Sequence, residues 1–106
     1  MRKLKEIGEM EGELCAKVWY NRHMGYRVDL DDLSQVLVEK HSEKFTPQNS
    51  ICREIWERAL EAAKRVEKEY GEHNLGPWDD FDWGMINGKL SALRWVLGDE
   101  WDMLDT

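Results

Sequence analysis

The chain of 106 residues suits one domain and is too short for two independent hydrophobic cores, so we expect a single domain over residues 1–106. Its net charge of −7 argues against a general nucleic-acid-binding protein, which needs a basic surface to neutralise phosphates. A hydrophobic content of 42%, with six Trp, excludes a disordered acidic tail because these residues can fill a core.

No segment predicts export or membrane insertion. The N-terminal stretch begins with basic residues but lacks the continuous apolar run of a signal peptide, and no run approaches the roughly 20 apolar residues that span a bilayer. Cys15 and Cys52 lie far apart and form no CxxC motif, so we expect free thiols in a reducing cytoplasm rather than a disulfide. The prediction is a cytoplasmic protein with neither a membrane nor nucleic acid among its partners.

The first predicted helix runs from about Lys3 to His23. Apolar side chains recur there at intervals of three and four residues, which places them on one helix face, with Glu and Lys opposite. Gly25 is expected to end this helix. A second, short helix is expected to follow, with Asp29 or Asp31 as its N-cap. Its inward-facing residues would be Leu30, Leu33, Val36 and Leu37.

The third predicted helix has the clearest pattern. Thr46 is a good N-cap, Pro47 suits the first helical turn, and Gly71 is favourable just beyond the C-terminus. Between these positions one continuous apolar stripe, rich in Ala, faces inward. We therefore expect a long helix that another helix crosses closely.

The fourth predicted helix starts at Asp79 or Asp80, whose carboxylates can cap it, and ends at Gly98. Apolar residues cover most of its circumference, which is typical of a helix enclosed by neighbours. The C-terminal tail is expected to pack Trp101 and Leu104 onto the body. The predicted fold is therefore all-α, a single compact domain of about four helices around a central C-terminal helix.

One polar stripe interrupts the fourth helix. At spacings of four and three residues, it comprises Asp80, Gly84, Asn87, Ser91 and Arg94. In one interpretation, the small residues allow a close helix contact and Arg94 pairs with a carboxylate of the chain, Asp80 and Glu100 being the nearest in sequence. In the other, the stripe lines a groove where Arg94 binds an anionic group and Asn87 hydrogen-bonds a ligand or peptide. We favour the first, because buried polar groups usually find internal partners.

Tryptophan is enriched among binding residues and is also a large core filler. Trp19 and Trp56 lie within apolar stripes and are expected in the core. Trp78, Trp83 and Trp101 surround the ends of the fourth helix and are candidates for an aromatic surface. The candidate binding residues are Asp80, Trp83, Asn87, Ser91, Arg94 and Trp101.

No catalytic, metal or cofactor site is identified. The segment Gly84 to Lys89 superficially resembles a phosphate-binding loop, but it is one residue short, lacks the Ser or Thr that would hold magnesium, and lies within a helix. The acidic clusters at residues 79–82 and 99–102 lack EF-hand spacing, and the three His stand apart. Cys15 and Cys52 lie on apolar faces, where burial makes a thiol inert. We therefore predict no catalytic residue, no metal ion and no cofactor.

The segment from Trp78 to Thr106 is WDDFDWGMINGKLSALRWVLGDEWDMLDT. It resembles the C-terminal end of small uncharacterised prokaryotic proteins that finish in the pattern WGxxNGKLSALRWVLGxEWDxLDT. The pattern is long and specific, although it covers only the last part of the chain. That family has no assigned activity, so the resemblance implies no function, cofactor or catalytic residue.

An acidic, Trp-rich helical domain without a nucleophile, metal or phosphate motif is typical of a non-enzymatic intracellular interaction module. We expect it to self-associate, since so small a domain buries only about 60–70% of its chain surface and leaves apolar residues exposed. One alternative is a small-molecule-binding protein or enzyme that uses Asn87, Ser91 and Arg94. The other is an acidic DNA mimic, which is disfavoured because basic residues are interleaved with acidic ones on the third helix.

Overall fold

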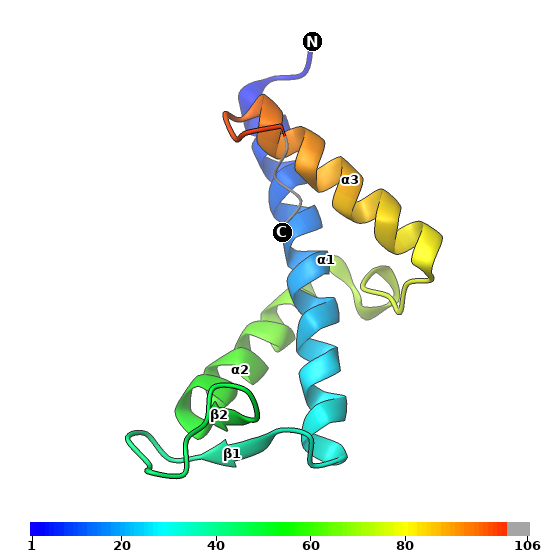
Figure 1. Ribbon diagram of the computed structural model, residues 1–106. Coiled ribbons are helices and arrows are strands. Elements are labelled where there is room, and N and C mark those ends of the chain that lie inside the picture. Colours follow the sequence, from blue (N-terminus) through cyan, green and yellow to red (C-terminus); the bar gives the residue numbers. More distant parts are fainter. Residues whose placement is uncertain (102–106) are drawn as a thin grey trace. The chain divides into compact units, whose positions relative to one another are not determined.

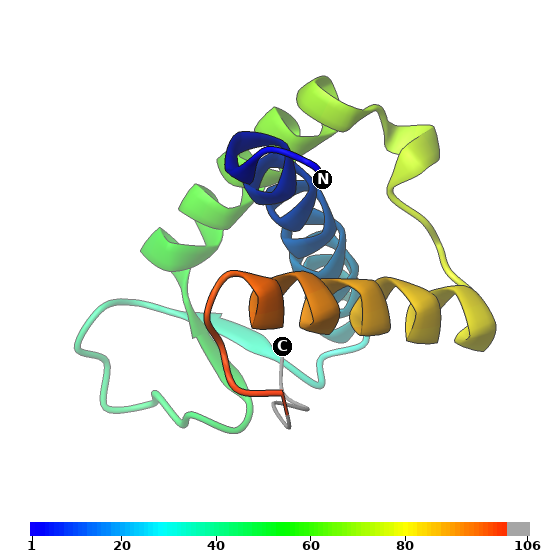
Figure 2. The same cartoon turned by 90° about the horizontal axis from the view of Figure 1, so that it is seen from above.

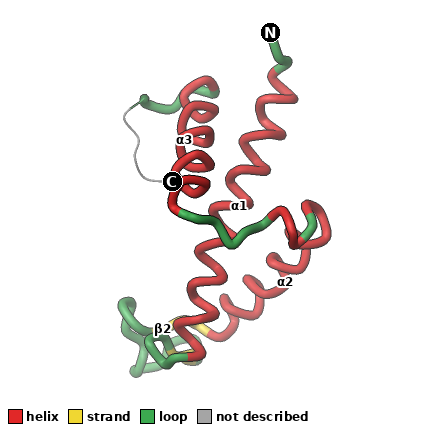
Figure 3. The backbone as a smooth tube through the Cα atoms, turned by 90° about the vertical axis from the view of Figure 1, so that its right-hand side faces the viewer, coloured by secondary structure: helices red, strands yellow, loops and turns green. Residues whose placement is uncertain are grey.

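The computed structural model describes residues 1–101 of the chain. Its elements in chain order are α1 (Leu4–Asp31), β1 (Val36–Val38), β2 (Ser50–Cys52), α2 (Arg53–Tyr70), a 3₁₀ turn (Glu72–Asn74) and α3 (Asp80–Val96) (Figure 1). Helices make up most of this part of the chain, and the strands are short (Figure 3). The helical prediction is confirmed in outline, but the described residues form three α-helices and a two-stranded sheet rather than four helices.

Helix α1 is longer than predicted, because Gly25 does not end it. The helix continues to Asp31 and takes up the residues that were expected to cap and begin a second helix. A Cβ built at Gly25 meets no atom within 4 Å, so no close contact requires glycine there. The position is therefore an exposed interior site of a helix, where glycine costs conformational entropy.

Replacing Gly25 with Ala should raise the free energy of unfolding by about 0.5–1 kcal/mol, because Ala loses less backbone entropy on entering a helix. Urea unfolding at fixed protein concentration measures the change. Gly76→Ala is the comparison and should instead lower the free energy of unfolding. Gly76 has a φ of 100°, and a Cβ there would lie 3.1 Å from Nε1 of Trp78. A loss of stability in Gly25→Ala would show that the helix ends at this residue after all.

The predicted second helix is wrong, because Val36–Val38 forms strand β1. Leu33 adopts a φ of 67°, which is incompatible with an α-helix and turns the chain after α1. The β-branched residues Val36 and Val38 then favour an extended backbone. Strand β1 pairs in parallel with β2, and Leu37 lies opposite Ile51.

The third predicted helix begins later than its capping pattern indicates. Residues 39–49 form the loop between the two strands (Figure 2). Within this region the backbone N–H of Ser50 donates to the carbonyl of Thr46 at 2.9 Å, so Thr46 belongs to a turn rather than a helix cap. Helix α2 starts at Arg53, after β2. Its predicted C-terminal residue is confirmed, because Gly71 follows Tyr70 with a φ of 83°.

The chain divides into two compact units, Met1–Asn21 with the chain from His73 onward, and Arg22–Glu72. In the first unit, α1 packs against α3 through one buried apolar cluster. Its members are Leu14, Val18, Ile86 and Leu90. In the second unit, Ala63 of α2 is completely buried.

The second unit also buries His23, which stacks on Trp56 with ring centroids 4.9 Å apart. Nε of Arg27 donates a hydrogen bond to Nε2 of His23 at 2.9 Å. Burial lowers the pKa of His23, and the positive charge of Arg27 lowers it further. This histidine is therefore held neutral as part of the packing.

Helix α3 starts as predicted, with the Asp79 carboxylate accepting a hydrogen bond from the backbone N–H of Asp82 at 2.7 Å. It ends at Val96, and Gly98 follows with a φ of 118°. The expectation that α3 is enclosed by neighbours is wrong, because its N-terminal and C-terminal turns expose large apolar side chains. The predicted packing of Leu104 lies outside the described residues.

Candidate functional site

Members of the polar stripe of α3 interact with other groups of the same compact unit. The side-chain N–H of Asn87 donates to the backbone carbonyl of Trp83 at 2.8 Å, one turn earlier in the same helix. Asp80 is exposed in the first helical turn. Ser91 is half-buried, and it has an interaction partner within the protein. The stripe thus shares one helix face, as its spacing predicts.

Arg94 has a carboxylate partner in the chain, as expected, but the partner is Glu11 of α1 rather than Asp80 or Glu100. Nε of Arg94 lies 3.4 Å from Oε1 of Glu11, and Nη2 lies 3.5 Å from Sγ of Cys15. The Arg94 and Glu11 side chains are 25% and 26% exposed, respectively. This ion pair bridges α1 and α3 beside the buried cluster. Sequence spacing offers no signal for it, because the two residues are on different helices.

The glycines of α3 do not support the predicted close helix contact. A Cβ built at Gly84 or Gly88 meets no atom within 4 Å in the described part of the chain. Both positions face open space instead. The close helix contact that these glycines were expected to allow is therefore not formed in the described part of the chain.

Two apolar faces run along α3. The packed face contacts α1 through Ile86 and Leu90, with Trp83 and Leu93 partly buried against the same cluster. The second face is turned away from this cluster, and we call it the exposed apolar face. It comprises Phe81, Met85, Gly88, Ala92, Trp95 and Val96.

Side chains of the exposed apolar face are unusually accessible for their size. The exposed fractions are 74% for Phe81, 45% for Met85 and 52% for Trp95. Trp101 extends this surface beyond the helix, because its ring meets that of Trp95 edge-on with centroids 5.4 Å apart. Trp101 is 61% exposed, so it lies at the surface, as one expectation had it, rather than packed into the body, as the other did. Trp78 and Trp83, which were expected at the same surface, pack instead against the buried cluster.

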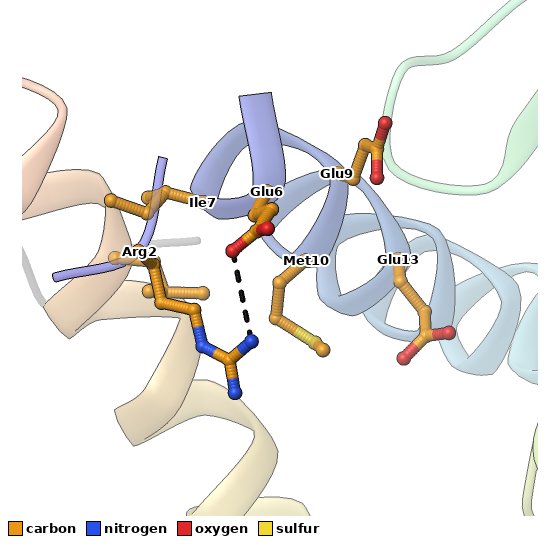
Figure 4. Close-up of a pocket in the computed structure, with 7 residues that line it drawn as sticks. Arg2, Glu6, Ile7, Glu9, Met10 and Glu13 are labelled. Atoms are coloured by element: carbon orange, nitrogen blue, oxygen red, sulfur yellow. Dashed lines mark ion pairs between the residues drawn. The ribbon is translucent and has the colours of Figure 1, made fainter. Parts of the chain in front are cut away.

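A hollow of the first unit lies away from the polar stripe, at the start of α1 (Figure 4). Its volume is about 490 Å³, and it is lined by Arg2, Glu6, Ile7, Glu9, Met10, Glu13 and Leu93. Arg2 and Glu6 form an ion pair across 3.7 Å, with the Arg2 side chain largely exposed and the Glu6 side chain about half exposed. Of the residues predicted to bind, none lines this hollow.

The described residues contain no group of three or more His, Cys, Asp or Glu side chains placed to hold a metal ion. Among the same residues, no helix combines the length and apolar character that crossing a bilayer requires. Comparison of the chain with protein-family models, curated proteins and solved structures finds no match.

Proposed function

We propose that this protein is an interaction module that self-associates through the exposed apolar face of α3. One observation carries the proposal: α3 is apolar on two sides, and the described chain packs against only one of them. Apolar area in water costs roughly 25 cal/mol per Å², so covering this face would be favourable.

The composition of the exposed apolar face also favours an interface. Soluble monomers rarely leave large contiguous apolar patches exposed, and such patches often mark contact sites. Aromatic residues and Met are enriched at the centres of protein interfaces, and the face presents Phe81, Met85 and Trp95. Gly84 and Gly88 leave room beside them for another backbone.

We place the protein in the cytoplasm as part of the same proposal. Cys15 and Cys52 are free thiols. Free thiols are typical of proteins in a reducing compartment.

The proposal is tested by the mass of the protein in solution. Wild-type protein at tens of micromolar should have at least twice the monomer mass of 12.6 kDa by light scattering or sedimentation. Met85→Glu should be monomeric at the same concentration, because the new carboxylate would have to be buried without a partner. Ile55→Glu is the matched control, since Ile55 of α2 is also an exposed apolar helix residue.

Ile55→Glu should keep the wild-type mass. A wild-type mass equal to one chain at tens of micromolar would overturn the proposal. An equal loss of assembly in Met85→Glu and Ile55→Glu would also overturn it, because the face on α3 would then have no special role.

A further inference from the structure

We infer that two copies of this chain pair through antiparallel α3 helices in one defined register. The inference rests on the proposed self-association and names its geometry. The exposed apolar face supplies the pattern, since Phe81, Met85, Gly88, Ala92 and Trp95 follow one another at spacings of four, three, four and three residues. Such spacing is the repeat by which two helices interlock side chains along a common seam.

Residue size along the seam favours the antiparallel arrangement. In a parallel pair each residue meets its own equivalent, so Phe81 would face Phe81 and Gly88 would face Gly88, leaving one crowded and one empty layer. In an antiparallel pair, Phe81 can face Ala92 of the second copy and Met85 can face Gly88 of the second copy. Each large side chain then fills the space beside a small one, as close packing requires.

Charges beside the seam favour the same arrangement. Asp82 follows Phe81 and Lys89 follows Gly88, so both flank the seam on the same side of α3. Both residues are exposed, and neither forms an ion pair with another described residue. In an antiparallel pair this edge of one helix runs beside the same edge of its partner, whereas in a parallel pair it runs beside the neutral edge of Gly84 and Ser91.

The register follows from those two charges. When Met85 faces Gly88 of the second copy, Asp82 lies near Lys89 of the second copy, and the two-fold symmetry makes this pair twice. A shift by one seven-residue repeat in one direction brings Lys89 against Lys89, and the opposite shift brings Asp82 against Asp82. Flanking charges commonly select helix orientation and register in this way. The same register satisfies both size and charge.

Mixing two charge-reversed variants tests the inference. Asp82→Lys and Lys89→Asp should each dimerise about tenfold more weakly than wild type at low salt, because two attractive pairs become repulsive. An equimolar mixture of the two should form heterodimers in preference to either homodimer, since both pairs are then attractive again. Native mass spectrometry with one variant labelled with ¹⁵N separates the three species.

A second measurement uses the unmodified sequence and so does not depend on how the variants fold. A carbodiimide condenses a carboxylate with a nearby amine to form an amide, and the reagent takes up the elements of water lost in the coupling and leaves as a urea. In a mixture of unlabelled and ¹⁵N-labelled wild-type protein, it should join the Asp82 side chain of one copy to the Lys89 side chain of the other. The cross-linked peptide should contain one labelled and one unlabelled half.

Failure of this inference can be distinguished from failure of the proposed function. A monomeric wild-type protein would overturn both. A dimer whose two variants mix statistically, and which gives no Asp82–Lys89 cross-link between copies, would overturn the antiparallel register while leaving self-association in place.

Discussion

Replacing Leu90 with Ala should lower the free energy of unfolding by about 2–5 kcal/mol, the range for deleting a large side chain from a packed core. Leu90 is 1% exposed and lies among Leu14, Val18 and Ile86, where α1 and α3 meet. The loss combines the transfer of the removed methyl and methylene groups to water with the cavity left behind. Chemical denaturation monitored by far-UV circular dichroism measures it.

Leu4→Ala is the matched control for this experiment. The chemical change is the same, but Leu4 is 73% exposed at the start of α1, so its replacement should alter the free energy of unfolding by no more than about 0.5 kcal/mol. Protein concentration must be held constant, because association adds to apparent stability. Equal losses in both variants would show that the cluster around Leu90 is not the core of this unit.

The same denaturation experiment tests the expectation of a single domain over residues 1–106. If the two compact units unfold together, Trp fluorescence and far-UV circular dichroism should report one coincident transition in wild type and in Leu90→Ala. A second transition that Leu90→Ala leaves unshifted would show that Arg22–Glu72 unfolds independently.

Arg94→Met should lower the free energy of unfolding by about 1–3 kcal/mol. Removing one partner of a buried ion pair costs about 3–5 kcal/mol, and the cost here is smaller because water reaches about a quarter of the Arg94 and Glu11 side chains. The main cause is the Glu11 carboxylate, which would stay in the α1–α3 interface without its cation. Thermal and chemical denaturation measure the change.

A double-mutant cycle identifies this cause. Glu11→Gln removes the negative charge, so adding Arg94→Met to it should cost less than Arg94→Met alone, with a coupling of about 1–2 kcal/mol. If Arg94 instead anchors a ligand, Arg94→Met should leave stability unchanged or raise it, because binding sites often sacrifice stability. A melting temperature equal to or above that of wild type would therefore favour Asn87, Ser91 and Arg94 as a ligand-binding site.

The sequence by itself determined the helical character of the chain and several of its local boundaries. The cap at Asp79 and the glycines at Gly71 and Gly98 were predictable, because capping depends on hydrogen bonds and dihedral angles within a few residues. The two apolar faces of α3 could also be recognised, since helical spacing assigns each side chain to a face. Such features involve neighbours along the chain only.

Local rules were misleading where partners distant in sequence decided the outcome. Val36–Val38 became a strand because Ser50–Cys52 lies beside it, and no spacing within either segment indicates that pairing. Gly25 was misleading for a local reason, because a glycine in a helix interior costs only about 1 kcal/mol relative to Ala, too little to end a helix that continues to Asp31. In each case a modest local preference was outweighed by the surrounding structure.

Only the tertiary structure decided which apolar face of α3 is covered and which carboxylate Arg94 meets. Periodicity shows that a side chain is apolar and where it lies on the helix, but not whether another element packs against it. The covered face is the one that meets Leu14 and Val18, and the same contact brings Glu11 to Arg94. These outcomes depend on how α1 and α3 approach each other, which is set by packing between segments far apart in the chain.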